Sequence, residues 1–410
     1  MHERPHLHRR TPAGDRRPAT PRRLRSGLAA LLLGLTLVPA AAAPAAAAPA
    51  CGPAGGAAPA QRTWALDRLA PESVWPLTRG GGIVVAVIDS GVAAGHPLLR
   101  GQVLPGVDLG LPNHRGQCDE VGHGTLIGGI IAGRTGTGVP YSGIAPEARI
   151  LPIRILRDTA RTFDQDLPAR IATAIRWAVD KGAHVINLSL VTVDTPALAE
   201  AVRYAVSKRV VLVAAAGNQS EQQPGQPAYP ARYPGVIAVA GIDQQSGHVG
   251  SSVSGDYVDV AAPGLAIDGP APGGDGYLHE SEGGTSYATA YVAGVAALVR
   301  SYHPQLTAEE VADRIIRTSD APPEGRNADV GYGVVNPYRA VSELLGTRTV
   351  EPLGALPPAP PREDPLAWQR DVAIWTALLG LALALALLLV RPAARLGRSR
   401  GWRPGRRADA

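Results

Sequence analysis

The stretch IVVAVIDSG at residues 83–91 decides the fold class. Its β-branched apolar residues follow one another with little polar alternation, which predicts a strand buried on both faces of a parallel sheet. Similar runs occur at residues 149–156, 184–190, 210–216 and 236–242. Helical patterns lie between and after them, at residues 126–132, 168–181, 196–208, 286–302 and 307–319. The alternation predicts an α/β domain with a doubly wound, mainly parallel sheet and helices on both faces.

Both ends of the chain carry its positive charge. The formal net charge is +5, but eight arginines lie in residues 1–26 and seven in residues 391–410, against three acidic residues there. The remaining 25 basic and 32 acidic residues give residues 27–390 a net charge of −7. A mildly acidic body gives no reason to expect binding to nucleic acid.

Residues 1–48 are typical of a secretory signal peptide. Arginines at 22–25 precede an apolar run at 27–38, and small residues suitable for cleavage follow. The apolar run is too short to span a bilayer. Cys51, just beyond, leaves lipidation as an alternative.

A second apolar segment lies near the C-terminus. Residues 372–390 contain no charge, and as a helix these 19 residues reach about 28 Å, close to the hydrocarbon thickness of a bilayer. The proline-rich segment 347–371 precedes them as a linker, and the arginine-rich segment 391–410 follows. Because arginine clusters stay on the cytoplasmic side, we expect a single-pass membrane protein with its main domain outside. A buried core helix is the alternative.

Three short motifs carry the chemistry. Asp89 ends the run VVAVID, His123 lies in GHGT, and Ser286 lies in GGTSYATA at the start of a predicted helix. A serine hydroxyl needs an adjacent base to become a nucleophile, and a carboxylate can orient that base. The order Asp, His, Ser along the chain is that of subtilisin. The trio predicts a serine hydrolase, to which we assign no cofactor and no metal site.

A fourth motif, VLVAAAGN, ends at Asn218. Its side-chain amide can donate a hydrogen bond to an oxyanion, as can the backbone N–H of Ser286 at a helix N-terminus. Taken alone, each residue has an ordinary structural explanation, such as a turn, a loop histidine or a helix cap. The four together, in this order, favour an active site.

The motifs VIDSGV, GHGT, VINLSL, AAAGN, YPARYPGVIAVA and GTSYATA resemble those of the subtilase family of serine peptidases, over about residues 80–345. The exported N-terminus, the cysteine ahead of GHGT and the single C-terminal span are similar to those of mycosins, the membrane-anchored subtilases of type VII secretion. The resemblance implies a triad of Asp89, His123 and Ser286 with Asn218 in the oxyanion hole. It also implies an extracytoplasmic endopeptidase that acts on protein or peptide substrates and is associated with the secretion machinery. The alternating strands and helices give this peptidase domain its bounds, residues 62–346.

The resemblance implies a set of substrate-binding residues. Segment 188–190 matches the subtilase strand that pairs with substrate backbone. Val191 and Ala231 replace glycines that are common in that family's primary specificity pocket, which implies a narrower pocket and a preference for small side chains. The full set is Leu188, Ser189, Leu190, Val191, Ala215, Gly217 and Ala231.

The chain has two cysteines, Cys51 and Cys118. Export to an oxidising compartment favours a disulfide between them, with two unrelated thiols as the alternative. Subtilisins carry a long propeptide, whereas here only residues 49–61 separate the predicted signal peptide from the domain. We therefore expect a short N-terminal arm that stays attached through this disulfide.

The sequence is also compatible with two other functions. A subtilase-like scaffold could stabilise a secretion complex without proteolysis, although a scaffold need not keep all four site residues. An esterase could use the same triad. The predicted substrate-binding strand favours peptides.

Overall fold

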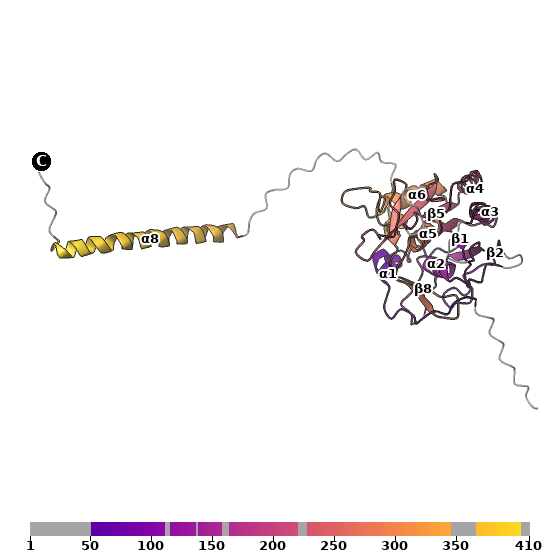
Figure 1. Cartoon of the computed structure of the whole chain (residues 1–410), viewed down its shortest axis with the longest axis horizontal. Helices are drawn as coiled ribbons and strands as arrows, with labels where there is room; N and C mark the ends of the chain where they lie inside the picture. Colours follow the sequence, from indigo (N-terminus) through magenta and orange to yellow (C-terminus); the bar gives the residue numbers. More distant parts are fainter. Residues whose placement is uncertain are drawn as a thin grey trace, which may run out of the picture. The chain divides into compact units, whose positions relative to one another are not determined.

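Seven strands form the central sheet in the order β2-β3-β1-β4-β5-β6-β7, and every neighbouring pair is parallel. Figure 1 shows the domain, with β1, β2 and β5 of this sheet labelled. The computed structural model describes residues 51–110, 115–136, 138–157, 164–219, 228–345 and 366–402. The strands are β1 (Val84–Asp89), β2 (Val107–Asp108), β3 (Arg149–Arg154), β4 (Val185–Leu188), β5 (Val211–Ala215), β6 (Val236–Ile242) and β7 (Val260–Pro263). The predicted doubly wound α/β fold is confirmed.

Alternate residues of each strand face opposite layers of helices. In β1, Val85 and Val87 join one hydrophobic core and Ala86 and Ile88 join the other, as the two-residue period of a strand requires. The first core also contains helices α2 (His123–Ala132), α5 (Thr285–Tyr302) and α6 (Ala308–Arg317). The second contains α3 (Leu167–Asp180) and α4 (Pro196–Ser207). Burial on both faces explains why the strands are apolar throughout.

The five strands predicted from apolar runs are all present, and four of them are one to three residues shorter in total than predicted. Strands β2, β7, β8 (Ile267–Pro270) and β9 (Tyr277–Glu280) were not predicted. Unlike the four residues of β4, their two to four residues are not part of a longer β-branched apolar run. Strands β8 and β9 form a separate antiparallel pair. The remaining short helices are α1 (Trp64–Leu69), the 3-10 turn η1 (Pro71–Ser73) and α7 (Pro337–Ser342).

The predicted capping box at the start of α6 is present. The Thr307 hydroxyl accepts a hydrogen bond from the Glu310 N–H (3.1 Å), and the Glu310 carboxylate accepts one from the Thr307 N–H (2.7 Å). The two bonds satisfy amide groups that have no partner within the helix.

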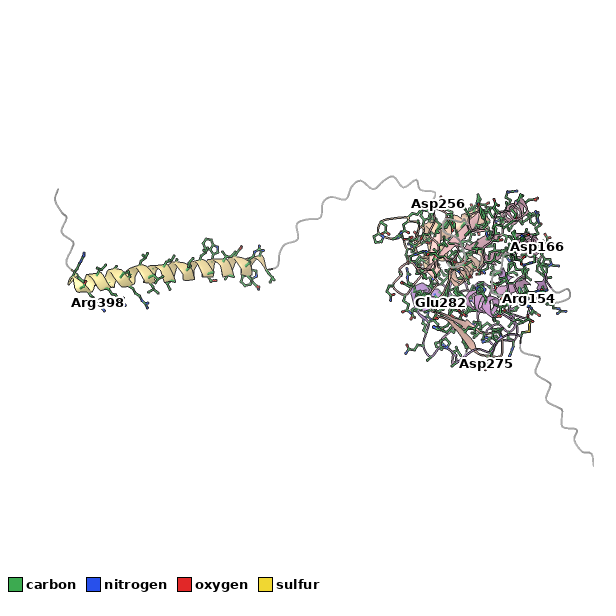
Figure 2. The ribbon with its side chains drawn as sticks, viewed as in Figure 1. Arg154, Asp166, Asp256, Asp275, Glu282 and Arg398 are labelled. Carbon is green, nitrogen blue, oxygen red and sulfur yellow. A yellow bond between two sulfur atoms is a disulfide. The ribbon has the colours of Figure 1, made fainter. Side chains whose placement is uncertain are left out.

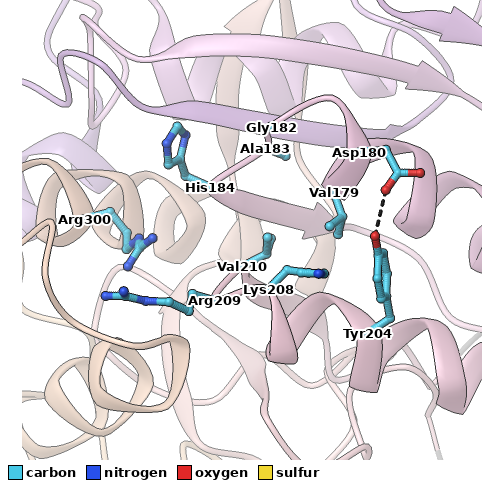
Figure 3. A pocket seen from close by; sticks show the side chains of 10 residues that line it. All are labelled: Val179, Asp180, Gly182, Ala183, His184, Tyr204, Lys208, Arg209, Val210 and Arg300. Carbon is cyan, nitrogen blue, oxygen red and sulfur yellow. Dashed lines mark hydrogen bonds between the residues drawn. The ribbon is translucent and has the colours of Figure 1, made fainter.

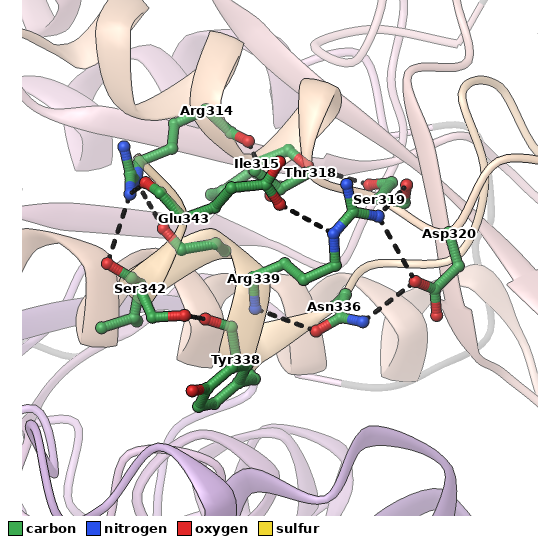
Figure 4. A network of polar contacts seen from close by, with 12 residues as sticks. Arg314, Ile315, Thr318, Ser319, Asp320, Asn336, Tyr338, Arg339, Ser342 and Glu343 are labelled. Carbon is green, nitrogen blue, oxygen red and sulfur yellow. Dashed lines mark hydrogen bonds and ion pairs between the residues drawn. The ribbon is translucent and has the colours of Figure 1, made fainter. Parts of the chain in front are cut away.

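A polar network fixes α7 against α6 at the end of the domain (Figure 4). Arg314, which is buried, donates hydrogen bonds to the backbone carbonyls of Ala340, Val341 and Glu343. Arg339 pairs with Glu343 at 2.8 Å and lies 3.7 Å from Asp320. These contacts give α7 polar anchors in addition to its small apolar face.

Helix α8 (Ala367–Ser399) contains the predicted span 372–390, and its side chains are exposed on all sides (Figure 2). It is long and apolar enough to cross a membrane. The helix extends beyond the uncharged run at both ends, from Ala367 to Ser399. The predicted signal peptide (1–48), residues 49 and 50 of the arm, most of the linker and the end of the basic tail lie outside the described residues.

Candidate active site

The four residues of the predicted site meet at the carboxyl ends of the central strands. Asp89 is the last residue of β1, His123 the first of α2, and Ser286 the second of α5, while Asn218 follows β5 by three residues. All four line one cavity of about 450 Å³. Ligands of open α/β sheets bind at this end of the strands, so the fold itself brings these side chains together.

Asp89 and His123 are directly hydrogen-bonded. The distance from Asp89 Oδ1 to His123 Nδ1 is 2.8 Å, and the same oxygen accepts a bond from the Ser90 N–H, also at 2.8 Å. The Asp89 side chain is fully buried, whereas 17% of the His123 side chain is exposed to the cavity side. A buried carboxylate bonded to Nδ1 holds the imidazole in one orientation, as the aspartate of a catalytic triad does.

A second buried carboxylate holds the start of α2. Asp119 Oδ1 accepts hydrogen bonds from the N–H groups of Val121 (3.1 Å) and Gly122 (2.8 Å), and Oδ2 accepts them from the N–H (2.8 Å) and hydroxyl (2.6 Å) of Thr125. Gly122 has a φ of 99°, which favours glycine at the residue before His123. Negative charge at a helix N-terminus is stabilising, so Asp119 fixes the turn that presents His123.

Ser286 belongs to the first turn of α5, whose N–H groups lack acceptors within the helix. It exchanges two hydrogen bonds with Ser189: the Ser286 hydroxyl donates to the Ser189 carbonyl (3.1 Å), and the Ser189 hydroxyl donates to the Ser286 carbonyl (2.8 Å). Asn187 in turn donates its side-chain amide to the Ser189 hydroxyl (2.9 Å). The segment at the end of β4 therefore fixes the position of Ser286 through these hydrogen bonds.

Asn218 is oriented by the residue before Ser286. Its side-chain oxygen accepts hydrogen bonds from the N–H (3.0 Å) and the hydroxyl (3.1 Å) of Thr285. Both donors meet the oxygen, so this oxygen is the acceptor end of the Asn218 side chain and the amide nitrogen is its donor end.

The predicted substrate-binding residues lie at and just after the ends of β4 and β5, except Ala231, which lies shortly before β6. Leu188 ends β4 and Ala215 ends β5, and the side chains of Leu188, Leu190 and Ala231 are buried, whereas Val191 is half-buried. The N–H of Gly217 donates to the Thr285 hydroxyl (3.3 Å). Among the residues that the structure describes, the lining of the 450 Å³ cavity includes Asn218 but none of these seven. Their substrate contacts remain a prediction.

Several described residues of the cavity were not predicted from the sequence. Glu280 at the end of β9 and Glu282 in the loop before α5 both line it (Figure 2 labels Glu282). Tyr287 packs beside the imidazole, with its ring centroid 5.6 Å from that of His123. Asp119 and Thr285, which support the site without lining the cavity, could have been noticed in the sequence. Asp119 is an acidic residue just before a predicted helix, and Thr285 is a threonine beside the serine. Nothing in the sequence pattern places the glutamates at the site.

The predicted Cys51–Cys118 disulfide is present, with Cα atoms 5.0 Å apart. The arm beyond it pairs with β9, because Gly56 and Tyr277 exchange backbone hydrogen bonds of 2.8 and 3.0 Å. Leu278, the next residue of β9, lines the cavity. The arm is therefore attached to one wall of the site.

Comparison with known proteins identifies the family. Residues 80–333 match the Peptidase S8 model, described as the subtilase family. The chain is 36% identical to Mycosin-4 of Mycobacterium tuberculosis over 83% of this chain and 82% of that protein. It is 37% identical to thermitase of Thermoactinomyces vulgaris over 68% of this chain and 96% of that protein.

Solved structures agree with the sequence matches. The MycP3 protease from the type VII (ESX-3) secretion system superposes with a TM-score of 0.63 at 33% identity, over 71% of this chain and 92% of that one. A chain of the intact ESX-5 inner membrane complex gives a TM-score of 0.63 at 31% identity, over 85% and 93%. The chain therefore belongs to the subtilase family of serine proteases, and within that family it is similar to the mycosins.

Proposed function

We propose that this protein is a membrane-anchored, extracytoplasmic serine endopeptidase that cleaves secreted protein substrates through Asp89, His123 and Ser286. The observation that carries the proposal is the convergence of these three side chains, with Asn218, on one cavity at the carboxyl ends of the strands. The 2.8 Å bond between Asp89 and His123 supplies the pairing that a triad needs.

In the proposed reaction, His123 removes the hydroxyl proton of Ser286 while Oγ attacks the carbonyl carbon of the scissile bond. The oxygen of the tetrahedral intermediate accepts hydrogen bonds from the Ser286 N–H and the Asn218 side-chain amide. His123 then gives the proton to the leaving amine. Water hydrolyses the acyl-enzyme by the same steps, and Asp89 stabilises the imidazolium at each of them.

Substrate binding follows from the segment after β4. An extended peptide would lie along Leu188, Ser189 and Leu190 and pair with their backbone. Ala215 and Gly217 would bound the pocket for the residue before the scissile bond. Val191 and Ala231 narrow that pocket, so we expect small side chains such as alanine there.

Anchoring rests on α8, which is long and apolar enough to cross a membrane. The arginines after residue 390 support an orientation with the C-terminal tail in the cytoplasm and the peptidase domain outside. Protease added to intact cells should therefore leave a tag at Ala410 untouched. Loss of that tag without lysis would contradict this orientation.

Association with type VII secretion machinery rests on the similarity to mycosins and to a chain of the ESX-5 inner membrane complex. That similarity also supports a second candidate function, in which the protein stabilises a secretion complex and proteolysis is secondary.

Labelling with a fluorophosphonate separates the two functions. The full-length protein in detergent micelles should be labelled at Ser286 and should hydrolyse peptides, whereas Ser286→Ala should do neither while keeping the same circular dichroism spectrum. Because triad residues act as a unit, His123→Ala should lose about as much activity as Ser286→Ala, and the double variant little more. An unlabelled, inactive but folded wild-type protein would leave only the structural role.

A further inference from the structure

A second cavity, of about 410 Å³, lies at the opposite end of the sheet from the serine site (Figure 3). His184 and Val210 line it immediately before β4 and β5, whereas Ser189, which bonds Ser286, lies just after β4. Five residues of extended chain separate His184 from Ser189, or about 16 Å. The cavity is therefore distinct from the candidate active site.

The lining of this cavity is rich in cations. Lys208, Arg209 and Arg300 line it together with a single carboxylate, Asp180. Asp180 accepts a hydrogen bond from the Tyr204 hydroxyl at 2.8 Å (Figure 3). Within the described parts of the chain, none of the three cations forms a salt bridge. Three cations and one carboxylate leave two positive charges in the cavity.

Arg300 is the deepest of these cations, with 8% of its surface exposed. Its Nη1 donates to the Leu306 carbonyl, but its buried Nε has no hydrogen-bond partner among the described residues. Arg209 donates to the same carbonyl at 3.0 Å, and the two guanidinium groups lie side by side in Figure 3. Burial, followed by the charge of Arg209, lowers the pKa of Arg300. Arg209 also donates to the Gln305 carbonyl, so the hydrogen bonds that the described residues offer these two cations all go to neutral backbone carbonyls. Two close like charges without a negative partner are a costly arrangement unless an anion joins them.

His184 adds a neutral polar group. Its Nδ1 accepts a hydrogen bond from the Val84 N–H (3.1 Å), so the proton of the neutral ring is on Nε2. Burial and the charge of Arg300 lower the pKa of this imidazole. The ring therefore contributes a donor rather than a fourth charge at neutral pH.

We infer that this cavity is a binding site for a phosphoryl group, either free phosphate or the phosphate of a larger molecule. A phosphate carries close to two negative charges near neutral pH and so matches the two unbalanced positive charges. Its oxygens can accept bonds from guanidinium and ammonium groups together, which are the partners that phosphate commonly finds in proteins. A carboxylate carries one charge and would leave the cavity positive. No reaction is implied, and the site does not depend on the proposed peptidase activity.

Calorimetric titration of the full-length protein in detergent micelles tests the site. Sodium phosphate, added at constant ionic strength against a chloride background, should bind with one-to-one stoichiometry and a Kd of about 1 mM or tighter. Lys208→Gln and Arg209→Gln, both at exposed positions, should each weaken binding at least tenfold. The matched control is Lys181→Gln, an exposed lysine nearby that does not line the cavity, and it should stay within twofold of wild type. Circular dichroism confirms that each variant is folded.

A second titration with glycerol 3-phosphate distinguishes the sources of the phosphate. Binding at least as tight as inorganic phosphate would indicate a phosphate ester, such as a lipid head group, whereas exclusion of the ester would indicate free phosphate. The proposal fails if wild type shows no saturable binding. It also fails if the folded Lys208→Gln, Arg209→Gln double variant binds like wild type, or if Lys181→Gln weakens binding as much as the two cavity variants.

Discussion

The side-chain oxygen of Asn218 accepts two hydrogen bonds from Thr285, one from the backbone N–H at 3.0 Å and one from the hydroxyl at 3.1 Å. Thr285 immediately precedes Ser286, so the proposed nucleophile and the proposed oxyanion donor are held by adjacent residues of one helix start. An amide that is fixed before the reaction needs no reorganisation when the oxyanion forms, which is the main source of such stabilisation. We therefore expect Thr285 to act as a positioning residue for Asn218.

Removing the Thr285 hydroxyl should lower kcat and leave KM nearly unchanged. Thr285→Val keeps the N–H bond but loses the hydroxyl bond, so we expect kcat to fall about tenfold. Asn218→Ala removes the oxyanion donor itself, and we expect it to lower kcat by the roughly 100- to 1000-fold that is typical of such a loss. Steady-state kinetics on a peptide substrate measures both constants. The combined variant should be little worse than Asn218→Ala alone, because Thr285 acts through Asn218.

Thr289→Val is the matched control for this substitution. Its hydroxyl bonds the Thr285 carbonyl within α5 (2.7 Å), and the residue does not line the cavity. We expect its kcat to stay within about twofold of wild type. Equal losses in the two threonine variants, or additive losses with Asn218→Ala, would show that Thr285 has only a packing role.

The glutamates of the cavity should select for basic substrates. Glu280 and Glu282 line it with Asp89, and the only cationic group that the described lining offers is His123 when protonated. A negative cleft attracts positive side chains, so peptides with lysine beside the scissile bond should have kcat/KM values about fivefold above their glutamine analogues at low salt. The preference should shrink as salt is added.

Substituting both glutamates tests this origin of the preference. The Glu280→Gln, Glu282→Gln variant should process lysine and glutamine peptides at similar rates, while Glu309→Gln, in the first turn of α6, should keep the wild-type ratio. Peptides that differ in one residue on each side of the scissile bond locate the subsite. A lysine preference that survives in the double variant would rule out the glutamates as its source.

His96 should make stability depend on pH below 6.5. The ring is buried; Nδ1 accepts a bond from the Leu98 N–H (3.2 Å) and Nε2 lies 3.1 Å from the Gly276 carbonyl. Burial lowers the pKa of this imidazole from its ordinary value near 6.5, against the opposing effect of the Gly276 carbonyl. The unfolded chain therefore binds a proton more readily than the folded protein. The stabilisation is complete above pH 6.5 and is lost as the pH falls toward the lowered pKa.

Thermal melts between pH 7.5 and pH 5 measure this contribution. The Tm of wild type should fall over that interval, and the Tm of a folded His96→Gln variant should fall less steeply. The variant should start from a lower Tm, because a glutamine side chain does not reproduce the geometry of the ring's hydrogen bonds to Leu98 and Gly276. Parallel curves for the two proteins would show that His96 does not titrate in this range.

The parts of this protein that were predictable from sequence are those fixed by neighbouring residues. Strand β1 was predictable because burial on both faces demands an unbroken apolar run, and the α6 capping box because its two bonds join residues three apart. Asp89, His123 and Ser286 could be predicted as candidate site residues because each occupies a distinct local motif. Their meeting in one cavity follows from the topology of the sheet.

What was missed depends on contacts between distant segments. The glutamates Glu280 and Glu282 lie in and just after β9, which is held by pairing with β8, and the sequence YLHE of β9 belongs to no apolar run that would predict a strand. The pairing of the arm with Tyr277 joins residues more than 200 positions apart, at Gly56, which has no side chain to reveal it. Such placements arise from tertiary packing, which overrides local preference.

The last prediction concerns the Cys51–Cys118 disulfide, whose loss should reduce stability more than activity. The bridge closes a sequence separation of 67 residues, for which chain entropy gives a stabilisation of about 4 kcal/mol as an upper figure. In a domain of this size, that corresponds to a fall in Tm of about 5–15 °C. The short arm has few other attachments to the domain, among them the Gly56–Tyr277 pair and the bond from the Gly273 N–H to the Pro53 carbonyl (3.0 Å).

Activity should survive because the groups that position His123 lie on the domain side of the bridge. Asp119, next to Cys118, holds the start of α2 through its own four hydrogen bonds, and none of these needs the arm. We therefore expect the Cys51→Ser, Cys118→Ser variant to keep kcat/KM at 25 °C within about threefold of wild type while its Tm falls.

Wild type treated with dithiothreitol is the matched control and should melt like the variant. A variant that loses peptide hydrolysis but melts at the wild-type temperature would show that the bridge acts on the site itself, and two alkylatable thiols in the exported protein would show that the bridge does not form.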